Sequence, residues 1–286
     1  MRIWPRRRWR KNLRKTKNPP PLRLSAPPPE IVPVIAALLE SRAALTALRR
    51  TLPKGGPRVI TCRSAAALHR LLEKRLIDAV VLAPQPVLLP ELSQWRVRLP
   101  RIPLVAYAPF RPDDGELLLA CRHTVAAVAV EGVDDSIVGE LVVRSSITAE
   151  RRRALADAPR VLRLTETIQR AAWDLLVGEV ERPMRTSALA GRLRVSREHL
   201  SRQFGAGGAP NLKRVIDLTR IACAAQLLAN PGYSLPTVAR VLNFASWGHL
   251  TNTSRRITNV TVKELGELGP RGVLAAFVRG NTRSRG

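Results

Sequence analysis

The strongest constraint on this chain is an alternation, within residues 30–150, of short apolar runs and segments with helical spacing. The runs "IVPVIAAL", "RVITC", "DAVVLAP", "IPLVAYAPF" and "VAAVAVEG" have the Val, Ile and Ala content of strands buried on both faces. Amphipathic segments such as "AAALHRLLEKRL" lie between them. The alternation predicts βαβ units, and therefore an α/β domain with a parallel sheet covered on both faces. Such sheets place their sites at the carboxyl ends of the strands.

The pattern changes to successive helices without strand signals between residues 160 and 268. Ser196 is placed to cap "REHLSRQF" and Ser246 to cap "WGHLTNTSRRI", so two helix-turn-helix units are predicted. The segment "NLKRVIDLTRIACAAQLLAN" predicts one long helix between them. About 20 residues at 1.5 Å rise span roughly 30 Å, close to the roughly 34 Å between successive major grooves on one face of DNA. One chain can therefore place a helix in each of two adjacent grooves.

The formal net charge of +26 is unevenly distributed. Residues 1–29 contain ten Lys and Arg and no acid, residues 30–150 contain fifteen against thirteen, and residues 151–286 contain twenty-three against nine. The near-neutral middle argues against a uniformly Arg-rich composition as the cause. The charge of the last region therefore indicates contact with a polyanion such as nucleic acid.

Several segments are predicted to lie outside the two domains. Residues 1–29 are basic, rich in proline and aperiodic, which predicts a disordered tail. Trp4 and Trp9 suit contact with nucleic acid or membrane, but a solvated tail or an over-long gene start explains them equally well. Residues 151–160 are predicted as a linker and residues 271–286 as a basic C-terminal tail. The segment "DDSIVGELVVRSSITAERRRAL" predicts one closing helix for the α/β domain.

The sequence argues against several kinds of site. Three isolated cysteines without a CxxC pair support neither a zinc site nor a disulfide framework. A Gly-rich phosphate loop is missing, so no nucleotide or other cofactor is expected. No apolar run approaches the roughly 18 residues of a membrane helix, and the N-terminus lacks the apolar segment of a signal peptide. We therefore expect a cytoplasmic protein without metal, cofactor or membrane partner.

The fivefold alternation resembles, in pattern and length, a response-regulator receiver domain with flavodoxin-like topology. A receiver needs acids after its first strand, an acceptor Asp ending the third, Ser or Thr ending the fourth and Lys ending the fifth. The matching positions here are Glu40, Ala83, Ala108 and Glu131. Because alanine cannot be phosphorylated, residues 30–150 are predicted to be a pseudo-receiver that acts by contact.

The helical segment resembles the DNA-binding domain of the AraC/XylS family of transcription regulators. The family pattern "LA..L.vS..hLsR.F", "R...A..LL" and "iA...GF.s.s.F" is followed in order and spacing. The matching residues are Leu189, Ala190, Leu193, Ser196, His199, Leu200, Arg202 and Phe204, then Arg220, Ala224, Leu227 and Leu228, then Val238, Ala239, Phe244, Ser246 and Leu250. The resemblance implies an all-helical domain at residues 161–270 with two helix-turn-helix units.

The second unit departs from the family pattern. Asn243 replaces a turn glycine, which Asn tolerates because it can adopt positive φ. Asn259 and Val262 replace a later Gly and Pro. Ser254 stands where the family has a core aromatic, on one stripe with Leu250. A second unit that is less rigid, or that mainly contacts phosphates, is therefore one expectation.

The resemblance implies that the second helix of each unit contacts DNA through its outward face. The predicted contact residues are Arg197, Glu198, Ser201 and Arg202 in the first unit, and Trp247, Gly248, Thr251, Asn252 and Arg255 in the second. Arg202 suits guanine, Asn252 suits adenine, and Arg255 suits a phosphate. The alternative is that the basic face of these helices is only solvated and contacts no DNA. The Trp247 ring can also fold back onto the core instead of facing outward.

These features predict a sequence-specific transcription regulator rather than an enzyme. Its partner is double-stranded DNA, and the pseudo-receiver serves self-association as a homodimer or recruitment of RNA polymerase. A phosphorelay component would need the acceptor acid that Ala83 replaces. A non-specific or architectural nucleic-acid-binding protein is the alternative that the basic tail and Ser254 favour.

Overall fold

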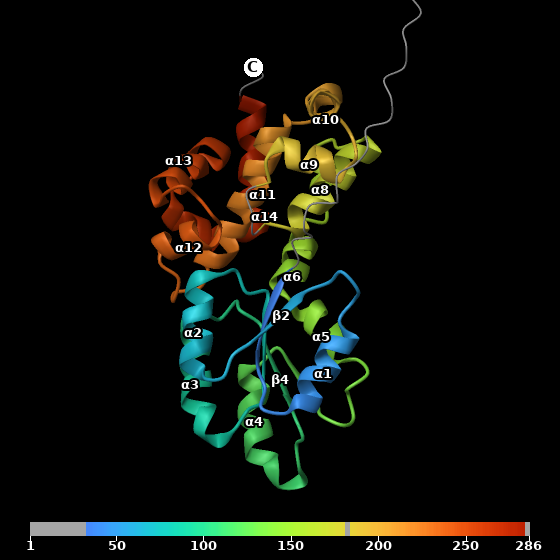
Figure 1. The fold of residues 1–286 in the computed structure, drawn as a ribbon. Coiled ribbons are helices and arrows are strands. Elements are labelled where there is room, and N and C mark those ends of the chain that lie inside the picture. The colour runs from blue at the N-terminus through green and yellow to red at the C-terminus, as the bar shows by residue number, and fades with distance from the viewer. Residues whose placement is uncertain (1–32, 181–183, 284–286) are drawn as a thin grey trace, which may run out of the picture.

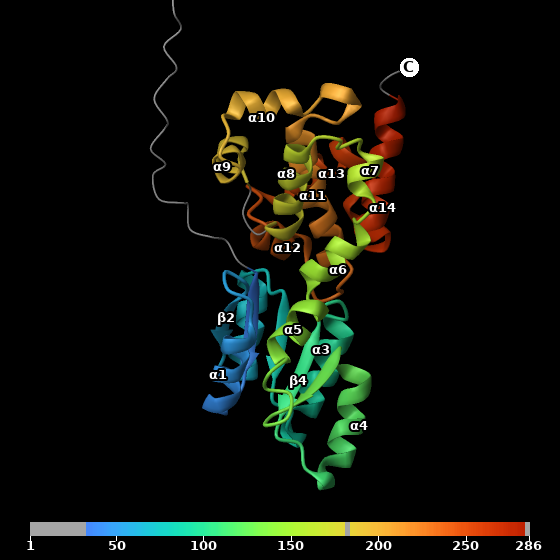
Figure 2. The same ribbon diagram turned by 90° about the vertical axis from the view of Figure 1, so that its right-hand side faces the viewer.

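The computed structural model describes residues 33–180 and 184–283. The predicted disorder of residues 1–29 lies outside the described residues. The chain forms a sheet-containing part followed by an all-helical part, as Figures 1 and 2 show. This confirms the predicted fold class of an α/β domain followed by an all-helical domain.

The sheet has five parallel strands in the order β2-β1-β3-β4-β5. The strands are β1 Val34–Leu38, β2 Arg58–Thr61, β3 Ala79–Leu82, β4 Leu104–Ala108 and β5 Ala127–Val130. The three central strands are almost entirely buried, and the two edge strands are partly exposed. Apolar runs of Val, Ile and Ala therefore became strands covered on both faces, as expected for parallel sheets.

Helices cover both faces of the sheet. One face packs against α1 (Arg42–Thr51) and α5 (Val138–Ser145). The other face packs against α2 (Ala65–Lys74) and α3 (Leu89–Arg98), and α4 (Gly115–Thr124) lies beside α3. Serine caps begin α1 and α2, where the side chains of Ser41 and Ser64 accept backbone N–H groups.

The predicted single closing helix is two helices, which corrects the sequence expectation. The chain turns at Ser146, where φ is −64° and ψ is 156°, and α6 (Ile147–Ala154) starts in a new direction. The hydroxyl of Ser146 accepts the N–H of Ala149 and so caps α6 instead of continuing α5. Because of this break, α6 leaves the sheet and packs against α8 and α11.

The helical part surrounds α11 (Leu212–Leu228), which is buried along nearly its whole length. Its other helices are α7 (Ala158–Val161), α8 (Thr167–Gly178), α9 (Thr186–Arg192), α10 (Arg197–Gln203), α12 (Leu235–Val241), α13 (Trp247–Thr258) and α14 (Val262–Arg283). With 17 residues, α11 spans roughly 25 Å, somewhat less than the 30 Å expected.

Two stretches predicted to lie outside the domains are packed helices. Residues 151–160 belong largely to α6 and α7, and Arg151 is only 1% exposed. Residues 271–283 continue α14 beyond a kink at Gly269, where φ is 59° and ψ is −177°. Val273 and Phe277 are fully buried there, and α14 packs along α11. Most of residues 151–160 and residues 271–283 are therefore helical and contribute buried side chains to the helical part.

The two parts share one cluster of buried hydrophobic side chains. We call the region where the two parts meet the joint. Hydrogen bonds also connect the two parts there: the hydroxyl of Tyr233 donates to the Leu72 carbonyl at 3.3 Å, and Asn230 Oδ1 accepts the Arg101 N–H at 2.7 Å. The Gly232 N–H donates to the Arg98 carbonyl at 2.6 Å. The joint is therefore a packed interface at the amino ends of the strands, beside α2 and α3.

Replacing Gly232 with Ala is expected to destabilise this joint by about 1–3 kcal/mol. A Cβ at this position would lie 2.8 Å from the Arg98 carbonyl oxygen and 3.0 Å from the Arg98 Cβ, so backbone must move. Urea unfolding measures the loss. Gly191→Ala is the control because Gly191 is an exposed position of α9 where a Cβ meets nothing within 4 Å, and it is expected to be neutral or slightly stabilising. Equal effects of the two substitutions would contradict a tight joint at Gly232.

Candidate nucleic-acid interface

Both helix-turn-helix units have the same turn geometry. Arg194 in the first turn and Asn243 in the second adopt left-handed conformations, with φ of 56° and 52°. The next residue then donates its N–H back to the first helix, Val195 to Ala190 and Phe244 to Ala239. The glycine replacement at Asn243 is accommodated as expected. The equivalent role of Arg194 was not anticipated, because an arginine gives no signal for positive φ.

Serine caps start both second helices. Ser196 accepts the His199 N–H at the start of α10, and Ser246 accepts the His249 N–H at the start of α13, at 3.1 and 3.0 Å. These caps satisfy N–H groups that a helix start leaves unpaired. The two helices lie on either side of α11, in the half of the molecule away from the sheet (Figure 1).

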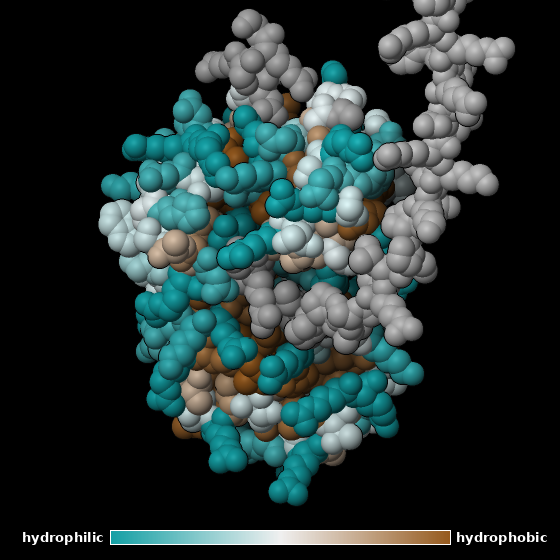
Figure 3. Space-filling model, turned by 45° about the horizontal axis from the view of Figure 1, so that its top comes forward, coloured by the Kyte–Doolittle hydropathy of each residue, from teal (hydrophilic) through white to brown (hydrophobic). Residues whose placement is uncertain are grey.

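All four residues predicted on α10 are exposed: Arg197, Glu198, Ser201 and Arg202. Leu200 is fully buried on the opposite side. The Arg197 Nε and the Glu198 Oε1 lie 3.6 Å apart, and both side chains are largely solvated, so this pair adds little to stability. Figure 3, which brings the helical end forward, shows hydrophilic residues over most of that end.

The predicted face of α13 also points outward. Asn252 and Arg255 are exposed, and Gly248 and Thr251 are half-buried. Trp247 is 60% exposed, so its ring does not fold back onto the core. The Thr251 hydroxyl donates to the Trp247 carbonyl at 3.0 Å, which leaves its methyl group and lone pairs for a ligand.

Ser254 is fully buried at the position of the family aromatic, and its hydroxyl is satisfied. The Oγ donates to the Val260 carbonyl at 3.3 Å, and the Thr258 hydroxyl donates to the Ser254 carbonyl at 2.8 Å. Asn259 ends α13 in a left-handed conformation, with φ of 58°, where the family uses glycine. Two of the departures from the family pattern, Ser254 and Asn259, thus lie at the same polar helix end.

Replacing Ser254 with Phe is expected to destabilise the protein by about 2–3 kcal/mol because the packed site must be forced open. Ser254→Ala removes one neutral hydrogen bond and should cost less than about 1.5 kcal/mol. Thermal and urea unfolding of both variants measure the difference. A neutral or stabilising Ser254→Phe would instead mean that the site retains room for the family aromatic.

Arg220 connects α11 to the second turn. Its guanidinium lies 3.8 Å from the centre of the Phe244 ring and donates to the carbonyls of Leu242 and Asn243 at 3.1 and 3.3 Å. Burial lowers the pKa of Arg220, and the nearby Asp217 carboxylate opposes this shift. The sequence placed Arg220 only as a family match and did not reveal this stack.

Two contacts attach the first unit to α8. Arg192 and Glu179 form a bidentate ion pair with N–O distances of 2.7 and 2.8 Å, and both side chains are mostly buried. The Gln169 amide donates to the Gln203 carbonyl at 2.6 Å, at the end of α10. Such bidentate pairs fix orientation as well as distance. These two contacts, at the end of α9 and at the end of α10, therefore fix the orientation of the first unit relative to α8.

The carboxyl ends of the strands bring together the four positions compared with a receiver. Glu40, Ala83, Ala108 and Glu131 line a cavity of about 500 Å³. Glu131 accepts a hydrogen bond from the Ser41 hydroxyl, so the loops after β1 and β5 are linked. Among the described residues, no group of three His, Cys, Asp or Glu side chains could hold a metal ion. No described helix is long and apolar enough to cross a membrane.

Comparison with known proteins identifies the helical segment. Residues 189–267 match a family model described as a helix-turn-helix domain, which confirms the AraC-type resemblance there and supports a DNA-binding transcription regulator. Among solved structures, full-length FixJ from B. japonicum is similar at 13% identity, with a TM-score of 0.34, over 78% of this chain and 96% of that chain. No curated protein matches the chain.

Proposed function

We propose that this protein is a sequence-specific DNA-binding transcription regulator that inserts α10 and α13 into adjacent major grooves. The observation that carries the proposal is the pair of exposed, polar second helices, each started by a serine cap after the same left-handed turn. They flank one buried helix of roughly 25 Å. The length of this helix is of the order of one helical turn of DNA, which supports insertion into adjacent grooves.

Affinity and sequence choice have different sources in this proposal. Lys and Arg of the basic helical part displace counterions from DNA and provide most of the affinity. Arg202 donates two hydrogen bonds to guanine, and Asn252 pairs with adenine through its amide. Glu198 accepts from cytosine, the Thr251 methyl group contacts thymine, and Arg255 holds a phosphate. Arg197, Ser201, Trp247 and Gly248 complete the contact surface.

The sheet-containing part acts by contact in this proposal, as a homodimerisation surface or as a docking site for RNA polymerase. Support comes from Ala83, which lies just beyond β3 where an acceptor carboxylate would be required. Phosphoryl transfer has no acceptor there, and catalysis is not part of the proposed function. The binding of DNA by α10 and α13 does not depend on which partner this part contacts.

Selection of genomic DNA fragments by the purified protein at physiological salt tests the proposal. Wild type is expected to select a motif with two half-sites about one helical turn apart. Arg202→Ala should weaken binding about 5- to 150-fold and lose the motif, and Asn252→Ala should relax one end of it. Arg144→Ala is the charge-matched control, because this exposed arginine lies on α5.

The outcomes separate the proposal from its main alternative. A motif insensitive to Asn252→Ala would mean that the second unit contacts only phosphates. Equal affinity of wild type for selected and random fragments would overturn sequence-specific binding and favour an architectural nucleic-acid-binding protein.

A further inference from the structure

A basic cavity of about 460 Å³ lies beside the second recognition helix. The end of α13, the first turn of α11 and the last part of α14 form its walls. Four arginines line it: Arg214, Arg255, Arg256 and Arg279. Among the described residues that line this cavity, none is acidic. We call it the arginine pocket.

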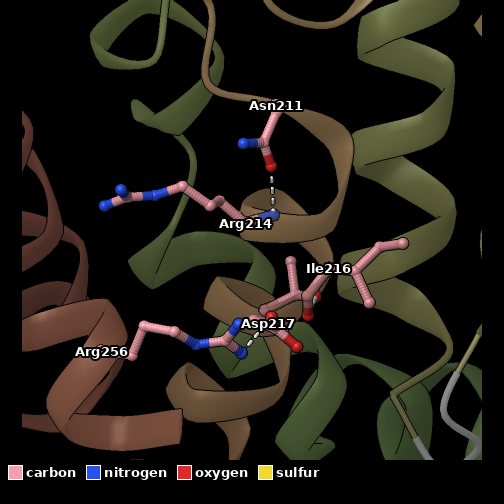
Figure 4. A network of polar contacts seen from close by, with 6 residues as sticks. Asn211, Arg214, Ile216, Asp217 and Arg256 are labelled. Atoms are coloured by element: carbon pink, nitrogen blue, oxygen red, sulfur yellow. Dashed lines mark hydrogen bonds and ion pairs between the residues drawn. The ribbon is translucent and has the colours of Figure 1, made fainter. Parts of the chain in front are cut away.

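Two arginines of the arginine pocket, Arg256 and Arg214, have different surroundings. The Asp217 carboxylate accepts a hydrogen bond from Arg256 at 2.7 Å, and Figure 4 shows that Arg214 extends away from this pair. The Arg214 guanidinium lies 5.1 Å from the centre of the Phe277 ring. Its buried Nε has no hydrogen-bond partner among the residues that the structure describes. A buried donor without a partner is costly, and like charges brought together repel.

An oxyanion in the arginine pocket would offset the repulsion among its four arginines. Guanidinium groups match the geometry of phosphate oxygens and bind them through paired hydrogen bonds. Thr258 and Asn259, at the polar end of α13, also line the pocket. A bound phosphate would also connect α11, α13 and α14, because its arginine partners come from all three helices.

We propose that the arginine pocket binds a phosphate group next to the second recognition helix. Arg255 belongs both to this pocket and to the outward face of α13, so a DNA backbone phosphate at the rim of the groove is one source. A free phosphorylated small molecule presents the same chemistry and is the other source. The DNA source rests on the function proposed above, whereas binding of a free phosphate does not.

Binding of inorganic phosphate to the full chain tests the pocket without DNA. Melting temperatures are compared as sodium phosphate replaces sodium chloride at constant ionic strength. The variants are Arg279→Ala in the pocket and Arg271→Ala, an exposed arginine on the same helix outside it. Wild type and Arg271→Ala are expected to gain about 2 °C more than Arg279→Ala, because a ligand stabilises only the protein that binds it.

Binding to a selected DNA duplex across a salt series tests the DNA source. Loss of one phosphate contact lowers the slope of log affinity against log salt by about 0.9. Arg279→Ala is expected to lower this slope by that amount relative to Arg271→Ala and to keep the sequence motif. Because both variants lose one positive charge, a general effect of net charge is the same in both.

Each combination of results has one meaning. A phosphate effect without a DNA effect assigns the pocket to a free phosphorylated ligand, and a DNA effect without a phosphate effect assigns it to the DNA backbone. If Arg279→Ala matches Arg271→Ala in both experiments, the arginine pocket does not bind phosphate. Wild-type selectivity for DNA is measured independently, so the proposed regulator function can stand when the pocket proposal fails.

Discussion

Replacing Arg151 with Ala is expected to lower the free energy of unfolding by about 3–5 kcal/mol. This side chain is 1% exposed and lies where the two parts of the chain meet. Its Nε donates to the Val177 carbonyl at 2.9 Å, and its Nη1 donates to the Gln226 amide oxygen at 3.3 Å. Its Nη2 donates to the Thr148 hydroxyl at 3.0 Å. Truncation leaves these acceptors unpaired beside a cavity.

Urea unfolding of Arg151→Ala should be followed by fluorescence and by circular dichroism. Arg153→Ala is the matched control, because Arg153 is an exposed residue two positions along the same helix. The control is expected to change stability by no more than about 0.5 kcal/mol. If both variants lost the same small amount, the buried hydrogen bonds of Arg151 would not be holding the joint.

The second large effect is expected at Arg220, whose replacement by Ala should cost about 3 kcal/mol. The substitution removes the stack on Phe244 and leaves the Leu242 and Asn243 carbonyls without this donor. Arg220→Lys should recover only part of the loss, because an ammonium cannot stack its plane on the ring while reaching two carbonyls. Urea unfolding measures both losses.

DNA binding by Arg220→Ala reports on the second helix-turn-helix unit. At a temperature where circular dichroism shows the variant folded, we expect weaker contact at the half-site that the proposed function assigns to α13 and unchanged contact at the half-site assigned to α10. Footprinting of the two half-sites measures this difference. Uniform weakening of both half-sites would mean that Arg220 supports the whole helical part rather than the second turn.

The sequence predicted the strands well because buried parallel strands require continuous apolar runs that little else produces. It missed the break at Ser146, since a serine inside an amphipathic run has the same spacing whether it caps a helix or lies within one. It also missed the helix after Gly269-Pro270, where the net positive charge concealed the spacing of Val273 and Phe277. Local patterns thus revealed the elements but not their ends.

The outward faces of α10 and α13 followed from helical periodicity, because a residue opposite a buried leucine must be exposed. The buried Ser254 was identified as a departure, but its hydrogen-bond partner in the loop after α13 was not. The stack of Arg220 on Phe244 and the unpaired Nε of Arg214 depend on contacts between distant segments. No spacing rule in a single sequence encodes such contacts.

The packed joint determines how binding of a partner to the sheet-containing part can affect the helical part. Its contacts come from residues before the strands, whereas the cavity at Glu40 and Glu131 lies after them, at the opposite end of the sheet. Because the sheet and the helices share one cluster of buried hydrophobic side chains, we expect a partner bound at that cavity to move both parts as one body. Binding of such a partner would then change the orientation of α10 and α13 together relative to DNA, and would not displace one of these helices alone.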